Sequence, residues 1–188
     1  RQDLERVNNI KDVGVIIDEK LCFRDHINEK VNKAYMMLGI IKRNFKFLEK
    51  EAVKNLYVYK AMVRSHLEYA QSSWSPRYKK DIELIEKVQK RATKHGAICK
   101  NKPYDDRLRI VDLPTLKFRR IRGDMIEAYK IVTGIYDIEA APALEMSSTT
   151  MTRGSERKLS KVRCRTELRK HFFTQRITDI WNKEQSSL

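Results

Sequence analysis

The sequence contains few of the residues on which several common classes of protein depend. Its 188 residues include only 6 Gly, and no glycine-rich loop of the kind that cradles phosphates in Walker-type or dinucleotide-binding proteins occurs. No apolar run approaches the roughly 20 residues that a membrane-spanning helix needs. The sequence therefore argues against these nucleotide-binding folds and predicts no membrane span.

Cysteine is also scarce. The three residues, Cys22, Cys99 and Cys164, lie far apart, and neither a CxxC pair nor a histidine at zinc-ligand spacing accompanies them. This pattern predicts reduced thiols rather than a disulfide framework or a structural metal, so we expect an intracellular protein, located in the nucleus, the cytoplasm or both. Because the chain begins at Arg1 rather than at a methionine, we also expect it to be a piece of a longer protein.

Positive charge, in contrast, is in excess and is concentrated in two blocks. The chain carries 40 Lys and Arg against 25 Asp and Glu, a formal net charge of +15, and its 41% hydrophobic content is sufficient for a core. Residues 77–122 hold 15 basic and 6 acidic side chains, and residues 153–176 hold 9 and 2, so these blocks account for more than the whole excess. Such clustering predicts a polyanionic partner, most often nucleic acid and less often an anionic membrane surface.

Hydrophobic spacing predicts a mainly helical protein that begins with one short β-strand. The strand is expected over 12–18, and helices are expected over 25–42, 49–69, 81–96, 105–111, 114–132, which Gly134 ends, and 174–181. The helix over 25–42 has an apolar stripe that consists of Ile27, Val31, Ala34, Leu38 and Ile41. The helix over 49–69 has in its register Val53, Leu56, Tyr57, Lys60 and Val63. The corresponding regions are 1–24 with the strand, 25–98 as a three-helix bundle, 104–136 as a second helical region, 137–152 as an exposed linker, and 153–188 as a basic tail with a terminal helix.

The helix predicted over 81–96 has two faces of different chemistry. Its apolar stripe consists of Ile82, Ile85, Val88 and Ala92. Roughly 155° away on the helical wheel lie four cations, Lys87, Lys90, Arg91 and Lys94. Cations in such a row have the spacing to follow a phosphate backbone, whereas the alternative is an ordinary solvated helix face.

The long helix predicted after Pro114 repeats this layout. Its buried side is expected to consist of Phe118, Ile121, Met125, Ala128, Tyr129 and Val132. Arg119, Arg120 and Lys130 are predicted to point away from the core, with Lys117 and Arg122 at the flanks. Two basic helix faces together favour a groove that binds a polyanion.

The basic tail contains Arg163 and Arg165, which we add to the candidate phosphate contacts, and ends in the pair Phe172 and Phe173. Aromatic side chains beside cations can stack on unpaired bases. Paired aromatics at the start of a helix more often pack, however, so we expect both rings to anchor the last helix to the core. The tryptophans Trp74 and Trp181 are expected in the core or at a domain junction.

The run Tyr104-Asp105-Asp106 superficially matches a metal-binding motif of polymerases. Polymerase chemistry requires paired carboxylates on a tight hairpin, holding two Mg²⁺ about 4 Å apart. Here Pro103 precedes the run and Arg107 follows it, a context that predicts the start of a helix, where two acids complement the helix dipole. We therefore expect no catalytic residue, metal site or cofactor in this chain, and no enzymatic activity of the chain by itself.

A series of short motifs follows in order along nearly the whole chain. They are Lys11-Asp-Val-Gly-Val-Ile-Ile-Asp18, Arg64-Ser-His-Leu-Glu-Tyr-Ala70, Trp74-Ser-Pro76, Glu86-Lys-Val-Gln-Lys-Arg-Ala92, Tyr104 with Arg107-Leu108, Leu113-Pro-Thr-Leu116, Thr152-Arg-Gly154 and Trp181-Asn182. This ordered set resembles the segment after the catalytic palm in the reverse transcriptases of non-LTR (LINE-like) retrotransposons. The sequence departs from the family at Ser65, where proline is frequent, and after Asn182, where a Leu-Pro pair is usual.

The resemblance implies that residues 1–24 end the palm, that 25–98 form the thumb, and that the remainder is the C-terminal region of an RNA-directed DNA polymerase. Catalytic aspartates and Mg²⁺ would then belong to the upstream palm and fingers, which are expected partners together with RNA or an RNA–DNA duplex. The expected phosphate contacts are Lys87, Lys90, Arg91, Lys94, Arg119, Arg120, Arg122, Arg163 and Arg165. The alternative is a domesticated, stand-alone helical interaction module that binds a protein partner or an anionic membrane surface.

Overall fold

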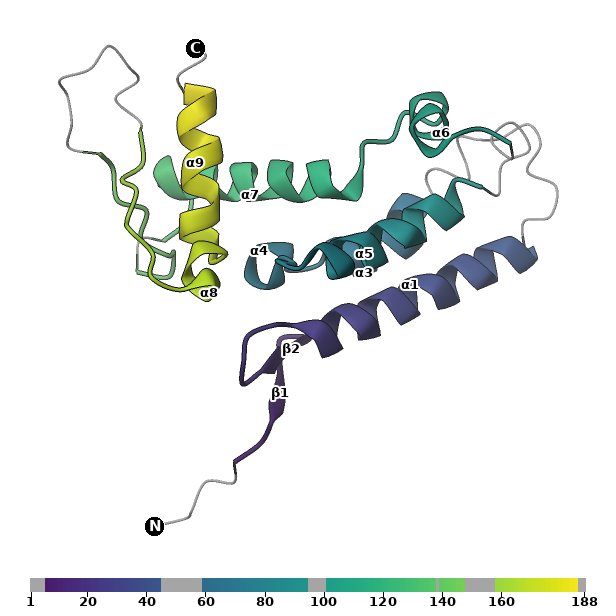
Figure 1. Ribbon diagram of the computed structural model, residues 1–188, viewed down its shortest axis with the longest axis horizontal. Helices are drawn as coiled ribbons and strands as arrows, with labels where there is room; N and C mark the ends of the chain where they lie inside the picture. Colours follow the sequence, from purple (N-terminus) through teal and green to yellow (C-terminus); the bar gives the residue numbers. More distant parts are fainter. Residues whose placement is uncertain (1–5, 45–58, 95–100, 138, 148–157, 186–188) are drawn as a thin grey trace. The chain divides into compact units, whose positions relative to one another are not determined.

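The computed structural model of the protein describes residues 6–44, 59–94, 101–137, 139–147 and 158–185. Within these residues the chain is mainly helical and begins with a small β-sheet, as the sequence predicts (Figure 1). The chain divides into two compact units, Arg1–Arg119 and Arg120–Leu188. This boundary lies inside one long helix, so each unit is described by itself.

The sheet at the front is a hairpin of strands β1 (Asn9–Asp12) and β2 (Val15–Asp18). The single strand predicted over 12–18 is therefore wrong in its first half, because the chain reverses at Val13 and Gly14. Both residues have positive φ, 41° and 77°, the backbone that a two-residue turn matching the twist of a hairpin requires. The Tyr69 hydroxyl donates to the carbonyl of Val13 at 2.9 Å and holds this turn against the helices.

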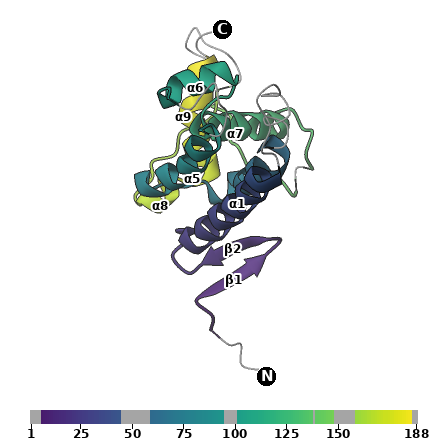
Figure 2. The same ribbon diagram turned by 90° about the vertical axis from the view of Figure 1, so that its right-hand side faces the viewer.

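Helix α1 (Arg24–Asn44) follows the hairpin, which lies beside its N-terminal end (Figure 2). The connection is held by the Asp18 carboxylate, which accepts hydrogen bonds from the backbone N–H groups of Cys22 and Phe23 at 3.1 and 2.6 Å. Burial raises the pKa of Asp18, but these hydrogen bonds outweigh it and lower the pKa overall. The predicted apolar stripe is confirmed as buried: Ile27, Val31, Ala34, Leu38 and Ile41.

His26, in the first turn of α1, is completely buried beside Trp74, with 4.9 Å between the ring centroids. Its Nδ1 accepts a hydrogen bond from the backbone N–H of Ile16 at 3.1 Å and so ties the hairpin to the helix. Burial, followed by repulsion from the ammonium group of Lys30, lowers the pKa of His26 from 6.5 to about 4. The imidazole is therefore neutral at pH 7.

The helix predicted over 49–69 is described only in its second half, because residues 45–58 lie outside the described part of the chain. That half is a π-helix, η1 (Tyr59–Arg64), followed by a short α-helix, α3 (Ser65–Glu68). Tyr59, Val63 and Leu67 are buried, four residues apart. Lys60, which the sequence places in the apolar register, is exposed, because this buried stripe runs through its neighbour Tyr59.

After Ala70, whose φ of 49° turns the chain, a single helical turn, α4 (Gln71–Trp74), occupies the segment where the sequence predicts a loop. Trp74 is fully buried, as predicted, and its indole N–H donates to the carbonyl of Tyr69 at 2.7 Å. Helix α5 (Lys79–Ala92) begins after four intervening residues. It ends at Ala92, with Thr93 as its C-cap, so the end predicted at Gly96 is wrong and the helix stops four residues earlier.

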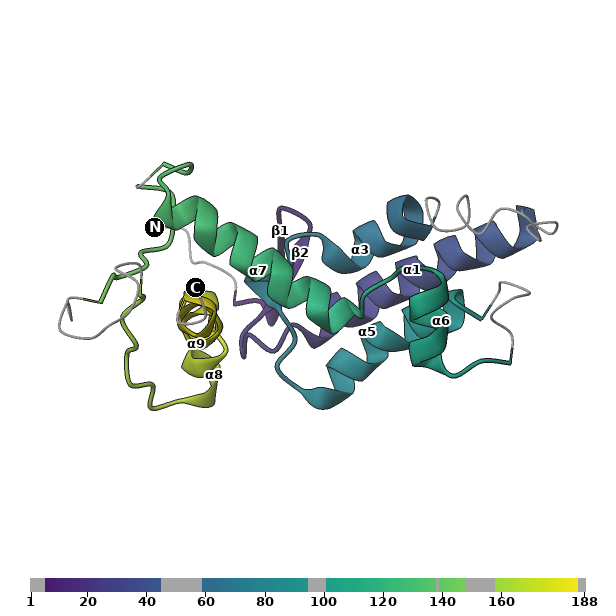
Figure 3. The same ribbon diagram turned by 90° about the horizontal axis from the view of Figure 1, so that it is seen from above.

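Within the first unit, α1, α3 and α5 lie side by side (Figure 3). Helix α6 (Tyr104–Ile110) carries Asp105 and Asp106 in its first turn, which confirms the helix-start interpretation of that run. The core of the unit consists of Val15, Ile27, Val31, Ala34, Leu38, Ile41, Tyr59, Val63, Leu67, Trp74, Ile85, Val88, Leu108, Leu113 and Leu116.

Helix α7 (Leu116–Val132) ends at Val132 as predicted, and Gly134, with a φ of 70°, lies in the turn that stops it. Its buried stripe, however, is Leu116, Arg120, Asp124 and Ala128, and Phe118 and Tyr129 are exposed instead of buried. Ala128 is buried and Met125 and Val132 pack against the second core as predicted, so hydrophobic spacing is wrong only for Phe118 and Tyr129 and misses Leu116, Arg120 and Asp124.

The second unit contains the part of α7 from Arg120 onward, the single turn α8 (Glu167–Lys170), and α9 (Phe173–Gln185), which crosses α7 in Figure 1. The terminal helix predicted over 174–181 is confirmed and is longer. Met146 pairs with Leu159 in an isolated antiparallel bridge, so part of the predicted linker contacts the tail. The core consists of Ala128, Leu159, Phe173, Ile177 and Trp181.

Candidate nucleic-acid interface

The four cations predicted on one side of α5 are all exposed there, and we call them the α5 basic face: Lys87, Lys90, Arg91 and Lys94. On the opposite side of the helix, Ile85 and Val88 are fully buried in the core of the first unit. The predicted orientation of α5 is therefore confirmed. An exposed acid, Glu83, lies one helical turn before Lys87. The row of cations without an exposed acid therefore begins at Lys87.

Helix α6 supports the C-terminal end of the α5 basic face. The buried Arg107 donates from Nη1 to the carbonyl of Lys90 at 2.8 Å and to the hydroxyl of Thr93 at 3.2 Å, and so satisfies a carbonyl at the end of α5. The ammonium of Lys90 lies 5.3 Å from the ring centroid of Tyr104, and the guanidinium of Arg91 lies 5.5 Å from that of Tyr35 in α1. Two of the four cations thus rest against aromatic rings that orient them.

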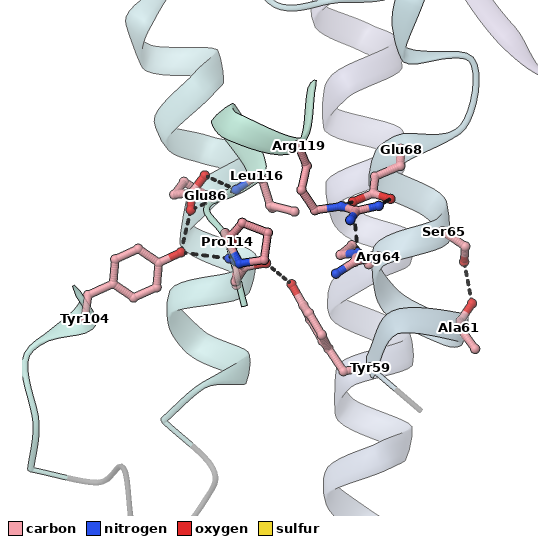
Figure 4. A network of polar contacts seen from close by, with 11 residues as sticks. Tyr59, Ala61, Arg64, Ser65, Glu68, Glu86, Tyr104, Pro114, Leu116 and Arg119 are labelled. Atoms are coloured by element: carbon pink, nitrogen blue, oxygen red, sulfur yellow. Dashed lines mark hydrogen bonds and ion pairs between the residues drawn. The ribbon is translucent and has the colours of Figure 1, made fainter. Parts of the chain in front are cut away.

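A polar network behind the α5 basic face holds α5 to its neighbours (Figure 4). Its centre is the fully buried side chain of Gln89. The amide oxygen accepts from the hydroxyl of Tyr59 at 3.0 Å, and the amide nitrogen donates to the hydroxyl of Tyr104 at 3.1 Å and to the carbonyl of Pro114 at 2.9 Å. Burial raises the pKa of Tyr59 and, together with the neighbouring Glu86, that of Tyr104, so both phenols remain protonated donors.

Glu86 links the same network to the start of α7. Its carboxylate accepts from the hydroxyl of Tyr104 and from the backbone N–H of Leu116, the latter at 3.1 Å. The Thr115 hydroxyl accepts from the N–H of Phe118 at 3.1 Å, so two of the free N–H groups at the beginning of α7 are capped. In the segment Glu86–Ala92, glutamate and glutamine therefore have structural roles, whereas Lys90 and Arg91 face the solvent.

Arg119 does not belong to an exposed basic face. Its Nε and Nη2 donate to the Glu68 carboxylate at 2.5 and 2.9 Å, and Arg64 contacts the same carboxylate at 2.9 Å (Figure 4). The hydrogen bonds with Glu68 raise the pKa of Arg119, whereas burial lowers the pKa of Arg64. Sequence reasoning missed this cluster because Glu68 and Arg119 lie 51 residues apart in the chain.

The other predicted contacts on α7 are divided between buried and exposed positions. Arg120, expected to point outward, is buried, and Lys130 is half-buried beside Glu127 at 3.2 Å. Arg122 is exposed. The prediction that α7 repeats the layout of α5 is therefore wrong, because the helix turns Arg120 and Asp124 inward together with Leu116 and Ala128.

Asp124 explains part of that orientation. Its carboxylate forms two hydrogen bonds of 2.9 Å with Arg176 of α9, a bidentate pair that lies almost entirely inside the second unit. This ion pair requires the side of α7 that carries Asp124 to face α9. The sequence did not predict this pairing, since the two residues lie 52 positions apart and belong to different predicted regions.

Arg163 and Arg165, the remaining predicted contacts, are exposed in the second unit. The structure thus brings together Lys87, Lys90 and Arg91 on α5 with Lys94 just beyond its end, and places Arg122, Arg163 and Arg165 on the second unit. The motif Thr152–Gly154 lies outside the described residues, as does Cys99. In the part of the chain that the structure describes, Cys22 and Cys164 are free.

Two further findings concern the described residues only. No group of three or more histidine, cysteine, aspartate or glutamate side chains among them is arranged to hold a metal ion. Likewise, none of the described helices combines the length and the apolar character that crossing a membrane requires.

Comparison with known proteins identifies one relevant similarity. The chain is 28% identical, over 144 residues, to an uncharacterized protein of Caenorhabditis elegans, a match that covers 75% of this chain and 72% of the worm protein. No protein-family model and no solved structure matches the chain.

Proposed function

We propose that this chain is the thumb and C-terminal region of a non-LTR retrotransposon RNA-directed DNA polymerase, and that its first unit grips RNA or an RNA–DNA duplex through the α5 basic face. One observation carries the proposal. Four cations are exposed together on one side of α5, while the other side of the helix is buried in the core and bonded through Gln89.

The spacing of these cations suits backbone contacts. From Lys87 to Arg91 the helix rises about 6 Å, a distance comparable to about two nucleotide steps along one strand of a duplex, and Lys94 follows just beyond the end of α5. Lysine and arginine that contact phosphates position a nucleic acid without reading its sequence. A polymerase that copies any template needs this type of grip, because base-specific contacts would restrict the sequences that it can copy.

The contacts of the motif residues support the assignment of the motifs between Lys11 and Leu116 to one folded unit. Tyr69 holds the hairpin turn, Glu68 joins α3 to α7, and Trp74 fills the core. Glu86 and Gln89 join α5, α6 and α7. The residues that resemble the family are thus the ones that join the hairpin and the helices of the first unit. A protein segment with the same residues is therefore expected to have the same arrangement of helices.

In this proposal the catalytic aspartates and their Mg²⁺ ions belong to an upstream palm, and the protein acts inside the cell, in the nucleus or the cytoplasm. The chain alone therefore performs no polymerisation. Incubation with a primed RNA template, Mg²⁺ and deoxynucleotides is expected to leave the primer unextended, and extension by the purified chain would contradict this part of the proposal.

The binding claim is tested by fluorescence anisotropy with an RNA–DNA duplex at low ionic strength. The double substitution Lys90→Glu and Arg91→Glu is expected to weaken binding at least tenfold, because each phosphate that a cation neutralises adds to the affinity by releasing counterions. The matched control, Lys20→Glu with Arg24→Glu, makes the same change in net charge at two exposed positions outside α5.

Equal losses in the two double variants would show that only net charge matters, and would contradict a specific role for α5. If neither variant nor the unmodified chain binds the duplex, the nucleic-acid proposal is wrong. Binding to vesicles of anionic lipid in place of the duplex would support the alternative, a stand-alone interaction module.

A further inference from the structure

We propose that the second unit carries a separate binding site for unpaired nucleobases, centred on Phe172 and Arg169, with the exposed Arg163 and Arg165 in the segment that leads to α8. We call these four residues the α8 patch. This site differs from the duplex grip of α5 in location and in ligand. It would hold single-stranded nucleic acid by stacking and by phosphate contacts, and it does not depend on whether α5 binds a duplex.

The first observation is the exposure of Phe172. Sequence reasoning expected both phenylalanines to pack, yet only Phe173 does, with 8% of its surface exposed, whereas Phe172 is 50% exposed. An exposed aromatic ring flanked by cations is the arrangement with which proteins stack unpaired bases, because every base has a face that can cover such a ring.

The second observation is that the backbone that carries the ring is held in place. The Phe172 N–H donates to the carbonyl of Arg169 at 3.2 Å, and its carbonyl accepts from the N–H groups of Gln175 and Arg176 at 3.0 Å each. The side chain of Arg176, anchored on Asp124, also donates to the carbonyl of His171 at 3.1 Å. Because this backbone is already bonded on both sides, only the side-chain torsions of Phe172 have to be fixed when a base stacks on the ring.

The third observation is the charge around the ring. The Arg169 guanidinium lies 5.2 Å from the ring centroid of Phe172, and half of the phenylalanine surface remains exposed with the guanidinium in that position. Arg163, Arg165 and Arg169 are all exposed, and none of them forms an ion pair with an acid among the described residues. The nearby Lys161 and Lys170 are paired with Asp179 and Glu167.

These observations favour nucleic acid over an apolar protein partner, because three arginines without acid partners would be costly to bury against an apolar surface. They favour a single strand over a duplex, because the bases of a duplex are stacked on each other and cannot cover a protein ring. The ligand class is therefore an unpaired stretch of RNA or DNA.

The test measures the affinity of the chain for a fluorescein-labelled oligothymidylate by anisotropy. Phe172→Ala is expected to raise Kd by about five- to a hundredfold, the range that the loss of one stacked base produces, whereas Phe172→Tyr retains a ring and the affinity. The matched control is Phe118→Ala, which removes a phenylalanine of similar exposure, 57%, from α7.

A second probe separates stacking from charge. An oligomer of the same length with abasic sites keeps its phosphates and loses its bases. The unmodified chain is expected to bind this abasic oligomer as weakly as Phe172→Ala binds oligothymidylate. The variant is expected to bind both oligomers with equal affinity. An unchanged Kd for Phe172→Ala, or equal affinity of the unmodified chain for both oligomers, would overturn the α8 patch. Loss of duplex binding on substitution in α5, with oligothymidylate binding retained, would show that the two sites are independent.

Discussion

Acidification is expected to destabilise the first unit through His26, which is neutral and fully buried in the folded protein. The pKa of His26 is about 4 in the folded state, against 6.5 as its ordinary value. The unfolded chain therefore binds a proton at a higher pH than the folded chain does. The stabilisation is complete above pH 6.5 and is lost as the pH falls toward 4.

The magnitude follows from these two values. Between pH 7 and pH 5 the linkage relation predicts a loss of about 2 kcal/mol in the free energy of unfolding, and the loss approaches about 3 kcal/mol at still lower pH. The physical cause is that Nδ1 of His26 accepts the N–H of Ile16, so a proton on this atom would break the bond that joins the hairpin to α1. The nearby Lys30 repels the added charge, although Glu29 partly offsets this repulsion.

The assay is urea denaturation followed by circular dichroism at pH 7, 6 and 5, a range above the ordinary pKa of the carboxyl groups. The comparison is His26→Asn, whose amide oxygen keeps an acceptor near the position of Nδ1 and does not titrate. We expect the variant to be less stable at pH 7 but to lose about 2 kcal/mol less than the unmodified chain on acidification. Parallel losses in the two proteins would refute the reasoning.

Three further substitutions are expected to affect stability, the first two measured by urea denaturation and the third by thermal melting. Glu68→Ala removes the partner of two arginines, one of them buried, and should cost about 3 kcal/mol, while Glu83→Ala at an exposed position should change little. Gln89→Leu leaves the carbonyl of Pro114 and two phenols without their buried partner, and should cost about 2–4 kcal/mol. Asp124→Asn weakens the bidentate pair of the second unit by about 1–3 kcal/mol, and thermal melting should detect this as a lower Tm.

Local patterns in the sequence predicted the elements of the fold in most places. The apolar stripe of α1, the orientation of α5, the helix start at Asp105 and the helix end at Gly134 each depend on residues within a few positions of one another. The hairpin was missed because Val13 sits in a turn that β-branched residues rarely adopt, so alternation alone extended the strand across it.

The remaining errors depend on partners that are distant in the chain. Arg119 was predicted as a phosphate contact, but a carboxylate 51 residues away neutralises it. The inward rotation of Asp124 follows from Arg176, 52 residues away, and not from the apolar pattern of α7. Phe172 was expected in the core because its neighbour Phe173 is there, and only tertiary packing determines which of two adjacent rings becomes buried. The α5 basic face was predictable because it depends on one helix alone.

Contact between the α5 basic face and the phosphates of a duplex can be measured through the salt dependence of RNA–DNA duplex binding. The slope of log Kd against log salt concentration reports the number of phosphates neutralised. We expect Lys90→Glu with Arg91→Glu to lower this slope by about two relative to the unmodified chain, and Lys20→Glu with Arg24→Glu to leave it unchanged. An unaltered slope in the α5 variant would contradict the proposed role of this face.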